Sequence, residues 1–222
     1  ANIAAASDRL TDGDFEQTGR REFTLAADDA ALTVELHAGD AFEFAADRHD
    51  PTAADPQFDL LIGMAFLDIV PFAQVAETLF PLVSGGGLGY FPITFDGATR
   101  FWPSHPADRT IERNYHEHMD TKPGGDSRAG GAVLERLQRT DGGRVLGVAG
   151  SDWIVRPIDG DYPNDEADFL RHILDTIEGA VGEVAGDDSA ALDEWLTVRR
   201  EQLDSGELIY LTHQLDILGQ LE

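Results

Sequence analysis

The sequence predicts an α/β fold built around a parallel sheet. Three apolar runs, at residues 32–36, 58–64 and 88–94, are short and rich in β-branched and aromatic side chains. The second and third runs barely alternate between apolar and polar residues, which is typical of strands covered on both faces. The segments between the runs are long enough for crossovers, so the strands are expected to run parallel. Ligands of such sheets bind at the carboxyl ends of the strands.

The composition indicates one soluble, globular domain over residues 1–222. A hydrophobic fraction of 42% in 222 residues is enough for a full-sized core. No stretch approaches the roughly 18 apolar residues of a membrane span, and the amino-terminal residues do not resemble a signal peptide. We therefore expect a cytoplasmic protein. Because the chain has no cysteine, disulfides, thiolate metal ligands and thiol nucleophiles are excluded.

The charge of the chain is strongly negative. It has 42 Asp and Glu against 16 Lys and Arg, giving −26, and the acidic residues are spread over its whole length. Phosphate binding needs clustered Lys and Arg, so neither nucleic acid nor a membrane is an expected partner. A dense acidic surface resembles that of halophilic proteins, which work where salt shortens the Debye length to about 3 Å. We expect the melting temperature to be lower in dilute buffer than in molar KCl.

Helical periodicity surrounds the predicted strands. Residues 2–10 have helical spacing, and the polar region 11–29 is expected to be a loop with an extended piece at 22–26. Pro71 is expected to open a helix that continues to about Val83, because proline is tolerated in a first helical turn. Further helices are predicted at 108–119, 129–137, 165–181 and 187–203, with Trp195 buried. Further strands are predicted at 144–155, bent near Gly150–Ser151, and at 208–218.

Two motifs have structural rather than catalytic interpretations. Gly85, Gly87 and Gly89 have the spacing of a phosphate loop, but here a helix precedes the glycines and a strand follows, so they predict a helix stop and tight turn. His116 and His118 lie two apart on a predicted helix and point about 200° away from each other, so no metal site is predicted. The G-x-S-x-G elbow of hydrolases is absent. Asp152, Trp153 and His213 are interpreted as structural.

Two aspartates follow predicted strands. Asp40, in the segment Gly39–Phe42, could accept a hydrogen bond from an exocyclic amine, with a neighbouring N–H donating to a ring nitrogen and Phe42 forming an apolar wall. An aspartate after a strand is also a common helix cap. Asp68 has the same two interpretations, as a cap of the helix begun near Pro71 or as a residue of the cleft. Both alternatives stay open for each residue.

The order of elements resembles the class I S-adenosylmethionine-dependent methyltransferases. It runs helix, strand, Gly-Asp-Ala, strand, helix, glycine turn, strand and a last strand that reads as antiparallel. The resemblance implies a Rossmann-like, mostly parallel sheet with an antiparallel last strand, helices on both faces, and a helical insertion after the family's fifth strand. Residues 97–127 would be that insertion, a possible lid. The family's glycine-rich cofactor loop has no counterpart here, so a homodimer or a missing amino-terminal segment is expected to complete the sheet.

The resemblance implies methyl transfer from S-adenosylmethionine to a small-molecule acceptor. The cofactor-binding residues it implies are Asp40, Ala41 and Phe42 at adenine, and Met64, Ala65 and Phe66 along the cofactor cleft. The substrate-binding residues would be Thr94, Trp102 and Tyr115. Candidates for the catalytic group are Tyr115, His116 and Asp96. The principal alternative is a noncatalytic binding or assembly module that keeps the fold. A dehydrogenase is a weaker alternative, since no dinucleotide fingerprint is visible.

Overall fold

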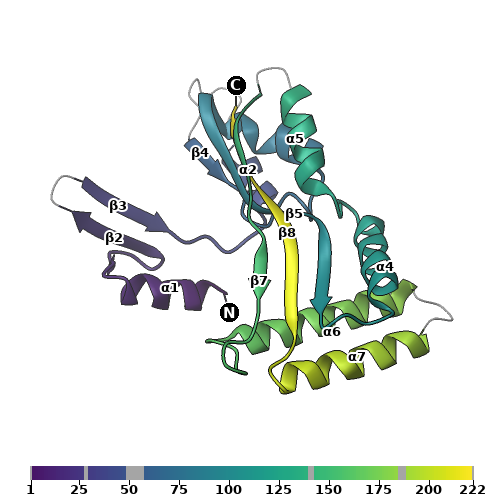
Figure 1. The fold of residues 1–222 in the computed structure, drawn as a ribbon. Helices are drawn as coiled ribbons and strands as arrows, with labels where there is room; N and C mark the ends of the chain where they lie inside the picture. The colour runs from purple at the N-terminus through teal and green to yellow at the C-terminus, as the bar shows by residue number, and fades with distance from the viewer. Residues whose placement is uncertain (1, 28–29, 49–57, 140–142, 185–188, 222) are drawn as a thin grey trace. The chain divides into compact units, whose positions relative to one another are not determined.

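The computed structural model describes residues 2–27, 30–48, 58–139, 143–184 and 189–221 (Figure 1). The chain forms two compact units, residues 1–50 and 51–222. In the described part of the chain, none of the helices combines the length and the apolar character needed to cross a membrane. The single-domain organisation over 1–222 stays a prediction.

The first unit holds a small antiparallel sheet. Its elements are α1 (Asn2–Asp12), β1 (Glu16–Gln17), β2 (Glu22–Ala27), β3 (Ala30–Glu35) and α2 (Ala41–Arg48). β2 pairs antiparallel with β3, with Phe23 opposite Val34, and β1 pairs antiparallel with β2. The prediction that residues 32–36 belong to the parallel sheet is therefore wrong. Only residues 28 and 29 separate β2 from β3, which is far too short for a crossover between parallel strands.

The second unit is built on a five-stranded sheet. Its strands are β4 (Phe58–Ile62), β5 (Val83–Trp102), β6 (Arg144–Gly150), β7 (Trp153–Val155) and β8 (Ile209–Gln220). The order is β4-β5-β8-β6, and β7 also pairs with β8. β4 is parallel to β5, whereas β8 is antiparallel to β5, β6 and β7. Four of the described strands thus share one direction and the last strand opposes them, which confirms the predicted α/β sheet.

Helices of the second unit lie around this sheet (Figure 1). They are α3 (Phe72–Thr78), the 3-10 turn η1 (Phe80–Leu82), α4 (Asp108–Thr121), α5 (Ala129–Arg139), α6 (Glu166–Val184) and α7 (Ser189–Asp204). The predicted helices are confirmed, with shifted ends. Residues 187 and 188 of the last predicted helix lie outside the described residues. The helix after Pro71 ends early, at Thr78, and residues 97–102 of the predicted insertion continue β5 before α4 begins.

The glycine run is part of a strand and not a turn, which corrects the prediction for residues 84–87. β5 begins directly after η1 at Val83. Gly86 has a φ of +82°, which L side chains rarely adopt, and its N–H donates to the carbonyl of Leu221 at 2.9 Å. The freedom of glycine therefore lets the chain leave η1 and enter the ladder with β8 within a few residues.

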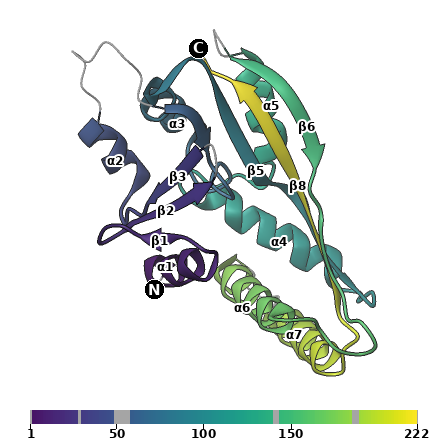
Figure 2. The same cartoon turned by 90° about the vertical axis from the view of Figure 1, so that its left-hand side faces the viewer.

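The main core of the second unit lies where α4, α6 and α7 meet the ends of β5 and β8. Figure 2 shows α6 and α7 side by side there. Trp195 is 1% exposed, so its predicted burial is confirmed. Burying side chains of this size is the main source of folding free energy, at about 25 cal/mol per Å² of apolar surface. Leu170, Leu174, Val181 and Leu208 are also fully enclosed in this cluster.

A charged residue lies inside this core. The side chain of Arg199 is fully buried and forms an ion pair with Asp108, the first residue of α4. The other partners of its guanidinium are the Pro103 carbonyl at 2.6 Å, Gln202 Oε1 at 2.7 Å, and the Phe101 and Trp195 rings at 5.6 and 5.4 Å. Trp195 Nε1 also donates to Asp108 Oδ1, at 2.8 Å. A buried guanidinium is tolerated because its charge is paired and most of its donors are satisfied.

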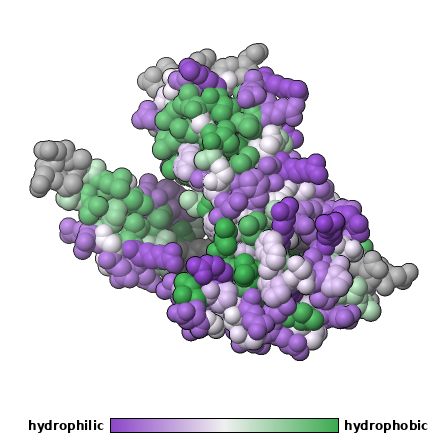
Figure 3. Space-filling model, in the orientation of Figure 1, coloured by the Kyte–Doolittle hydropathy of each residue, from purple (hydrophilic) through white to green (hydrophobic). Residues whose placement is uncertain are grey.

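The opposite end of the sheet exposes apolar side chains. Phe58, Leu60 and Ile62 occupy alternate positions of the edge strand β4, and Met64 follows them; all four are exposed. Figure 3, in the orientation of Figure 1, shows a hydrophobic patch in its upper part, where Figure 1 draws β4. Exposed apolar patches commonly mark interaction surfaces. The homodimer or missing amino-terminal segment expected from the sequence stays a prediction.

Candidate functional site

The backbone is strained just past the point where β4 and β5 part. Ala65 (φ +46°), Ile93 (φ +57°) and Ala98 (φ +70°) all have left-handed conformations. This conformation is especially unfavourable for the β-branched Ile93, whose N–H donates to the Asp216 carboxylate at 2.9 Å. The ladder between β5 and β8 shifts register on both sides of Phe95. Strain of this kind is concentrated at functional sites, so this bent part of β5 is the first place to seek one.

A buried acid and a buried phenol lie beside the strained segment. Oδ1 of Asp68, after β4, is buried without a hydrogen-bond partner among the described residues, and burial raises the pKa of Asp68. Burial also raises the pKa of Tyr115 on α4, and the charge of Asp68 raises it further. Tyr115 therefore stays protonated at neutral pH and can donate a hydrogen bond. Asp68 does not cap α3, because that helix begins after Pro71 without a side-chain cap.

His116 is held by the bend of β5. Its Nε2 lies 3.0 Å from Thr99 Oγ1, and its ring packs edge-on against Phe95 at 5.5 Å. Glu112, one helical turn earlier, accepts a hydrogen bond from the Thr99 N–H at 2.9 Å. Burial is the largest influence on the pKa of His116 and lowers it; Glu112 and Asp120 oppose this shift and Arg128 adds to it. The imidazole is consequently neutral at neutral pH, the state in which it can accept a proton.

A cavity of about 750 Å³ opens beside His116. One wall is a face of α4, the second is the bend at Gly97 and Ala98, and the third is the loop before α5. Asp120 fixes this loop, because its two oxygens accept from Ser127 N at 2.7 Å and Ser127 Oγ at 3.1 Å. The size suits a small-molecule ligand. The complete lining is Gly97, Ala98, Arg109, Glu112, Arg113, His116, Glu117, Asp120, Gly125, Asp126, Ser127 and Arg128.

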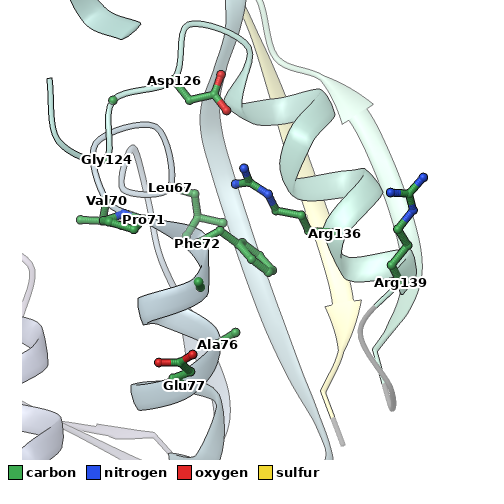
Figure 4. Close-up of a pocket in the computed structure, with 12 residues that line it drawn as sticks. Leu67, Val70, Pro71, Phe72, Ala76, Glu77, Gly124, Asp126, Arg136 and Arg139 are labelled. Carbon is green, nitrogen blue, oxygen red and sulfur yellow. The ribbon is translucent and has the colours of Figure 1, made fainter. Parts of the chain in front are cut away.

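A second hollow, of about 670 Å³, lies between α3 and α5 (Figure 4). Figure 4 shows Arg136 pointing from α5 toward Phe72, and its guanidinium lies 5.8 Å from the centre of that ring. The loop at Gly124 closes over Pro71 so tightly that a Cβ would come within 2.7 Å of its ring. The described residues that line it include no histidine, serine or tyrosine. The cavity at His116 is therefore the candidate active site.

The residues predicted to bind the cofactor fall in both units. Asp40 caps α2, since its Oδ1 accepts from the N–H groups of Phe42 and Glu43 at 2.8 and 3.0 Å. Asp40, Ala41 and Phe42 belong to the first unit, whereas Met64, Ala65 and Phe66 belong to the second. Met64 and Ala65 are exposed and Phe66 is half-buried. The joint role of these six residues stays a prediction.

The residues predicted to bind substrate do not surround one point. Thr94 is fully buried, and its hydroxyl donates to the Phe91 carbonyl at 3.1 Å, which leaves it no surface for a ligand. Trp102, half-exposed, is the last residue of β5, about 26 Å along the strand from Thr94. Tyr115 lies beside His116, with ring centres 6.0 Å apart. Of the three, Tyr115 is thus the one placed next to the candidate active site.

Asp96 faces away from the cavity at His116. Its Oδ1 accepts from the Gly131 N–H in the first turn of α5, at 2.8 Å. Its Oδ2 lies 4.0 Å from Nε2 of His213, whose Nδ1 lies 2.5 Å from Asp152 Oδ1. These contacts join β5, α5 and β8, which favours a structural role for Asp96, Asp152 and His213. Nowhere in the described ranges do three or more His, Asp or Glu residues come together as a metal site would require.

Sequence reasoning missed three residues of the site. Glu112 could have been found, because it lies four residues before His116 on a predicted helix and so shares its face. Thr99 and Arg128 approach His116 only because β5 bends and the loop before α5 folds back. Neither residue carries a signal in its local sequence.

Among the comparisons with known proteins, the comparison with solved structures found matches. No protein-family model and no curated protein sequence matches the chain. A putative methyltransferase from Bacillus halodurans aligns at TM-score 0.40 and 10% identity, covering 76% of this chain and 66% of that one. A putative sarcosine dimethylglycine methyltransferase from Galdieria sulphuraria aligns at 0.32 and 13%, covering 77% and 56%. A mycolic acid cyclopropane synthase aligns at 0.28 and 13%, covering 74% and 60%.

The chain aligns with these structures at low identity and over part of each. It spans between about half and two thirds of the length of these structures. Alignments at these TM-scores describe a partial likeness in backbone course and carry no information on substrate or activity.

Proposed function

We propose that the protein transfers a methyl group from S-adenosylmethionine to a small-molecule acceptor, with His116 as the general base. The observation that carries this proposal is a neutral, half-buried imidazole beside a ligand-sized cavity, just past the end of the parallel pair β4–β5. Ligands of parallel sheets bind at this end of the strands. Groups with perturbed pKa values in a cavity are candidates for catalysis.

The proposed role of His116 is to remove one proton from the acceptor. An oxygen or nitrogen acceptor must lose a proton as it attacks the methyl group, and a neutral imidazole can accept it. Thr99 Oγ1 fixes the ring through its 3.0 Å contact with Nε2, and the charges of Glu112 and Asp120 favour the imidazolium that forms. Protonated Tyr115 can donate a hydrogen bond from the neighbouring position on α4. The remaining rate enhancement comes from holding the acceptor in line.

The residues assigned to the cofactor fit an adenosyl group in their chemistry. Asp40 uses Oδ1 as a cap, which leaves Oδ2 able to accept from an exocyclic amine. Met64, 61% exposed, offers an apolar surface directly after β4. Within the first unit, Asp40, Ala41 and Phe42 would offer contacts to an adenine. Bound S-adenosylmethionine would supply an electrophilic methyl group.

The alternative, a noncatalytic binding or assembly module, gives no reason to keep a half-buried neutral imidazole beside an open cavity. Calorimetric titration of S-adenosylmethionine tests the cofactor side of the proposal, and the variant His116→Gln tests the acceptor side.

A further inference from the structure

Some of the charged side chains around the candidate active site have partners within the protein, and others do not. Four carboxylates and three guanidiniums line the cavity at His116, in a chain where acidic residues far outnumber basic ones. Which of these groups already have partners decides what kind of ligand the cavity can take, because a group with its hydrogen bonds made has little left to offer.

Each of the four carboxylates is held by donors of the protein itself. Glu112 accepts from the Thr99 N–H and lies 3.7 Å from Arg100 Nε. Both oxygens of Asp120 are taken by Ser127. Asp126 Oδ1 accepts from the Arg128 N–H at 2.8 Å, and Glu117 lies 3.8 Å from Arg113 Nε. These acids shape the walls of the cavity.

Two of the three guanidiniums have no such partner. Among the described residues, neither Arg109 nor Arg128 has a carboxylate within 4.0 Å, although Arg113 pairs with Glu117. Both side chains are exposed at the cavity. Arg128 is also close enough to His116 for its charge to act on the ring. With 42 acidic residues available for pairing, two unpaired arginines in one cavity call for an explanation.

We propose that this cavity binds an acceptor with a carboxylate or phosphate group, which the guanidinium of Arg128 holds. Arg109, two helical turns before His116 on α4, assists Arg128 in binding this group. This inference rests on the proposed methyl transfer for the meaning of "acceptor", although anion binding is measurable without it. Guanidinium recognises planar oxyanions through two parallel hydrogen bonds, which ammonium cannot do. An anion on Arg128 places the remainder of the acceptor against His116.

Binding of the anion also prepares the base. Glu112 and Asp120 raise the pKa of His116, whereas Arg128 lowers it, alongside burial. An anion on Arg128 cancels most of the positive charge facing the ring, so His116 becomes a stronger base when the acceptor is present. Tyr115, next to His116 on α4, stays protonated and contributes no charge.

The test uses inorganic phosphate as the probe, with the imidazole NMR signals of His116 observed in the full chain. Phosphate is expected to shift these signals saturably. Arg128→Gln should weaken the apparent affinity about tenfold to hundredfold, the range of one to two charge-assisted hydrogen bonds. Arg128→Lys keeps the positive charge but loses the two parallel N–H donors, so its apparent affinity for phosphate should be intermediate. Arg171→Gln on α6 makes the same charge change away from the cavity and should leave binding unchanged.

Transfer assays with phenol and 4-hydroxybenzoate separate this inference from the proposed function. A lower KM for the carboxylated acceptor, lost in Arg128→Gln, supports both. Saturable binding of phosphate with no transfer to either acceptor supports the anion site and counts against methyl transfer. Equal kcat/KM for both acceptors, with His116 signals that phosphate leaves unmoved in a folded chain, overturns the anion site and leaves methyl transfer standing.

Discussion

Replacing His116 with glutamine is expected to lower kcat/KM for methyl transfer by about 10²–10⁴-fold, the usual contribution of a general base. Glutamine keeps a polar side chain that can bond Thr99 Oγ1 but cannot accept the proton of the acceptor. Because burial lowers the pKa of His116, the wild-type rate should fall with decreasing pH only below the ordinary histidine pKa of about 6.5, and the variant should lose this acidic limb. Initial rates with labelled S-adenosylmethionine from pH 5 to 8 measure both effects.

The matched control is His172→Gln, which makes the same change at an exposed position of α6. Its rate and pH profile should equal those of the wild-type chain. S-adenosylmethionine should bind the His116→Gln variant unchanged, since the substitution acts on the acceptor. A variant that keeps the full rate and the acidic limb would remove His116 from the mechanism.

Replacing Asp108 with alanine is expected to lower the free energy of unfolding by about 3–5 kcal/mol, because it leaves the charge of Arg199 buried and unpaired. Asp108 also accepts from Trp195 Nε1 at 2.8 Å and from the His105 N–H at 2.7 Å, so three contacts are lost together. Urea denaturation in molar KCl measures the change without adding a second salt.

The control for this prediction is Asp175→Ala, which removes one of the two carboxylate partners of Arg200, at 2.9 Å, on the exposed side of α6. Exposed pairs contribute about 0–1 kcal/mol, so this variant should be nearly as stable as the wild type. The double variant Asp108→Leu with Arg199→Met should recover much of the loss, since apolar side chains remove the unpaired charge. A cost of under 1 kcal/mol for Asp108→Ala would show that Arg199 is compensated by its other partners.

The elements of the second unit were predictable because their patterns are long. The helices α4, α6 and α7 have several turns of apolar spacing, and β8 alternates between buried and half-buried residues with one break, at Leu215–Asp216. The break between β6 and β7 was also predictable, as the bend expected near Gly150–Ser151. The antiparallel direction of β8 came from the family resemblance and was confirmed by its pairing with β5.

The first unit was predicted poorly because its signals are short. The residues of β3 read equally well as a buried parallel strand and as one arm of a hairpin, and the run was assigned before its partner β2 was recognised in the polar region 11–29. The segment Ser84–Gly87 predicts a helix stop, because the local propensity of glycine favours turns. Pairing with β8 overrides this preference.

Part of the candidate site could be predicted, because local residue spacing shows which residues lie on helices and strands. Tyr115 and His116 were correctly placed on a helix, and Asp68 was considered as a helix cap or as a residue of the cleft. Thr94 and Asp96 are two residues apart and would share one face of a regular strand. In the irregular part of β5, however, Thr94 is buried in the core and Asp96 accepts a hydrogen bond from α5. Asp40 caps α2, which confirms one of its two interpretations, that of a helix cap. Contacts across loops, such as that between Arg128 and His116, require the tertiary fold.

Calorimetric titration of S-adenosylmethionine into the chain in molar KCl, with its folded state checked by circular dichroism, tests the central claim most directly. We expect saturable binding in the micromolar range that weakens in Asp40→Ala and is unchanged in His116→Gln. Asp216→Asn, which perturbs the bend of β5 but no predicted cofactor residue, should also bind normally. The absence of binding by a demonstrably folded chain would contradict methyl transfer and favour the binding or assembly module.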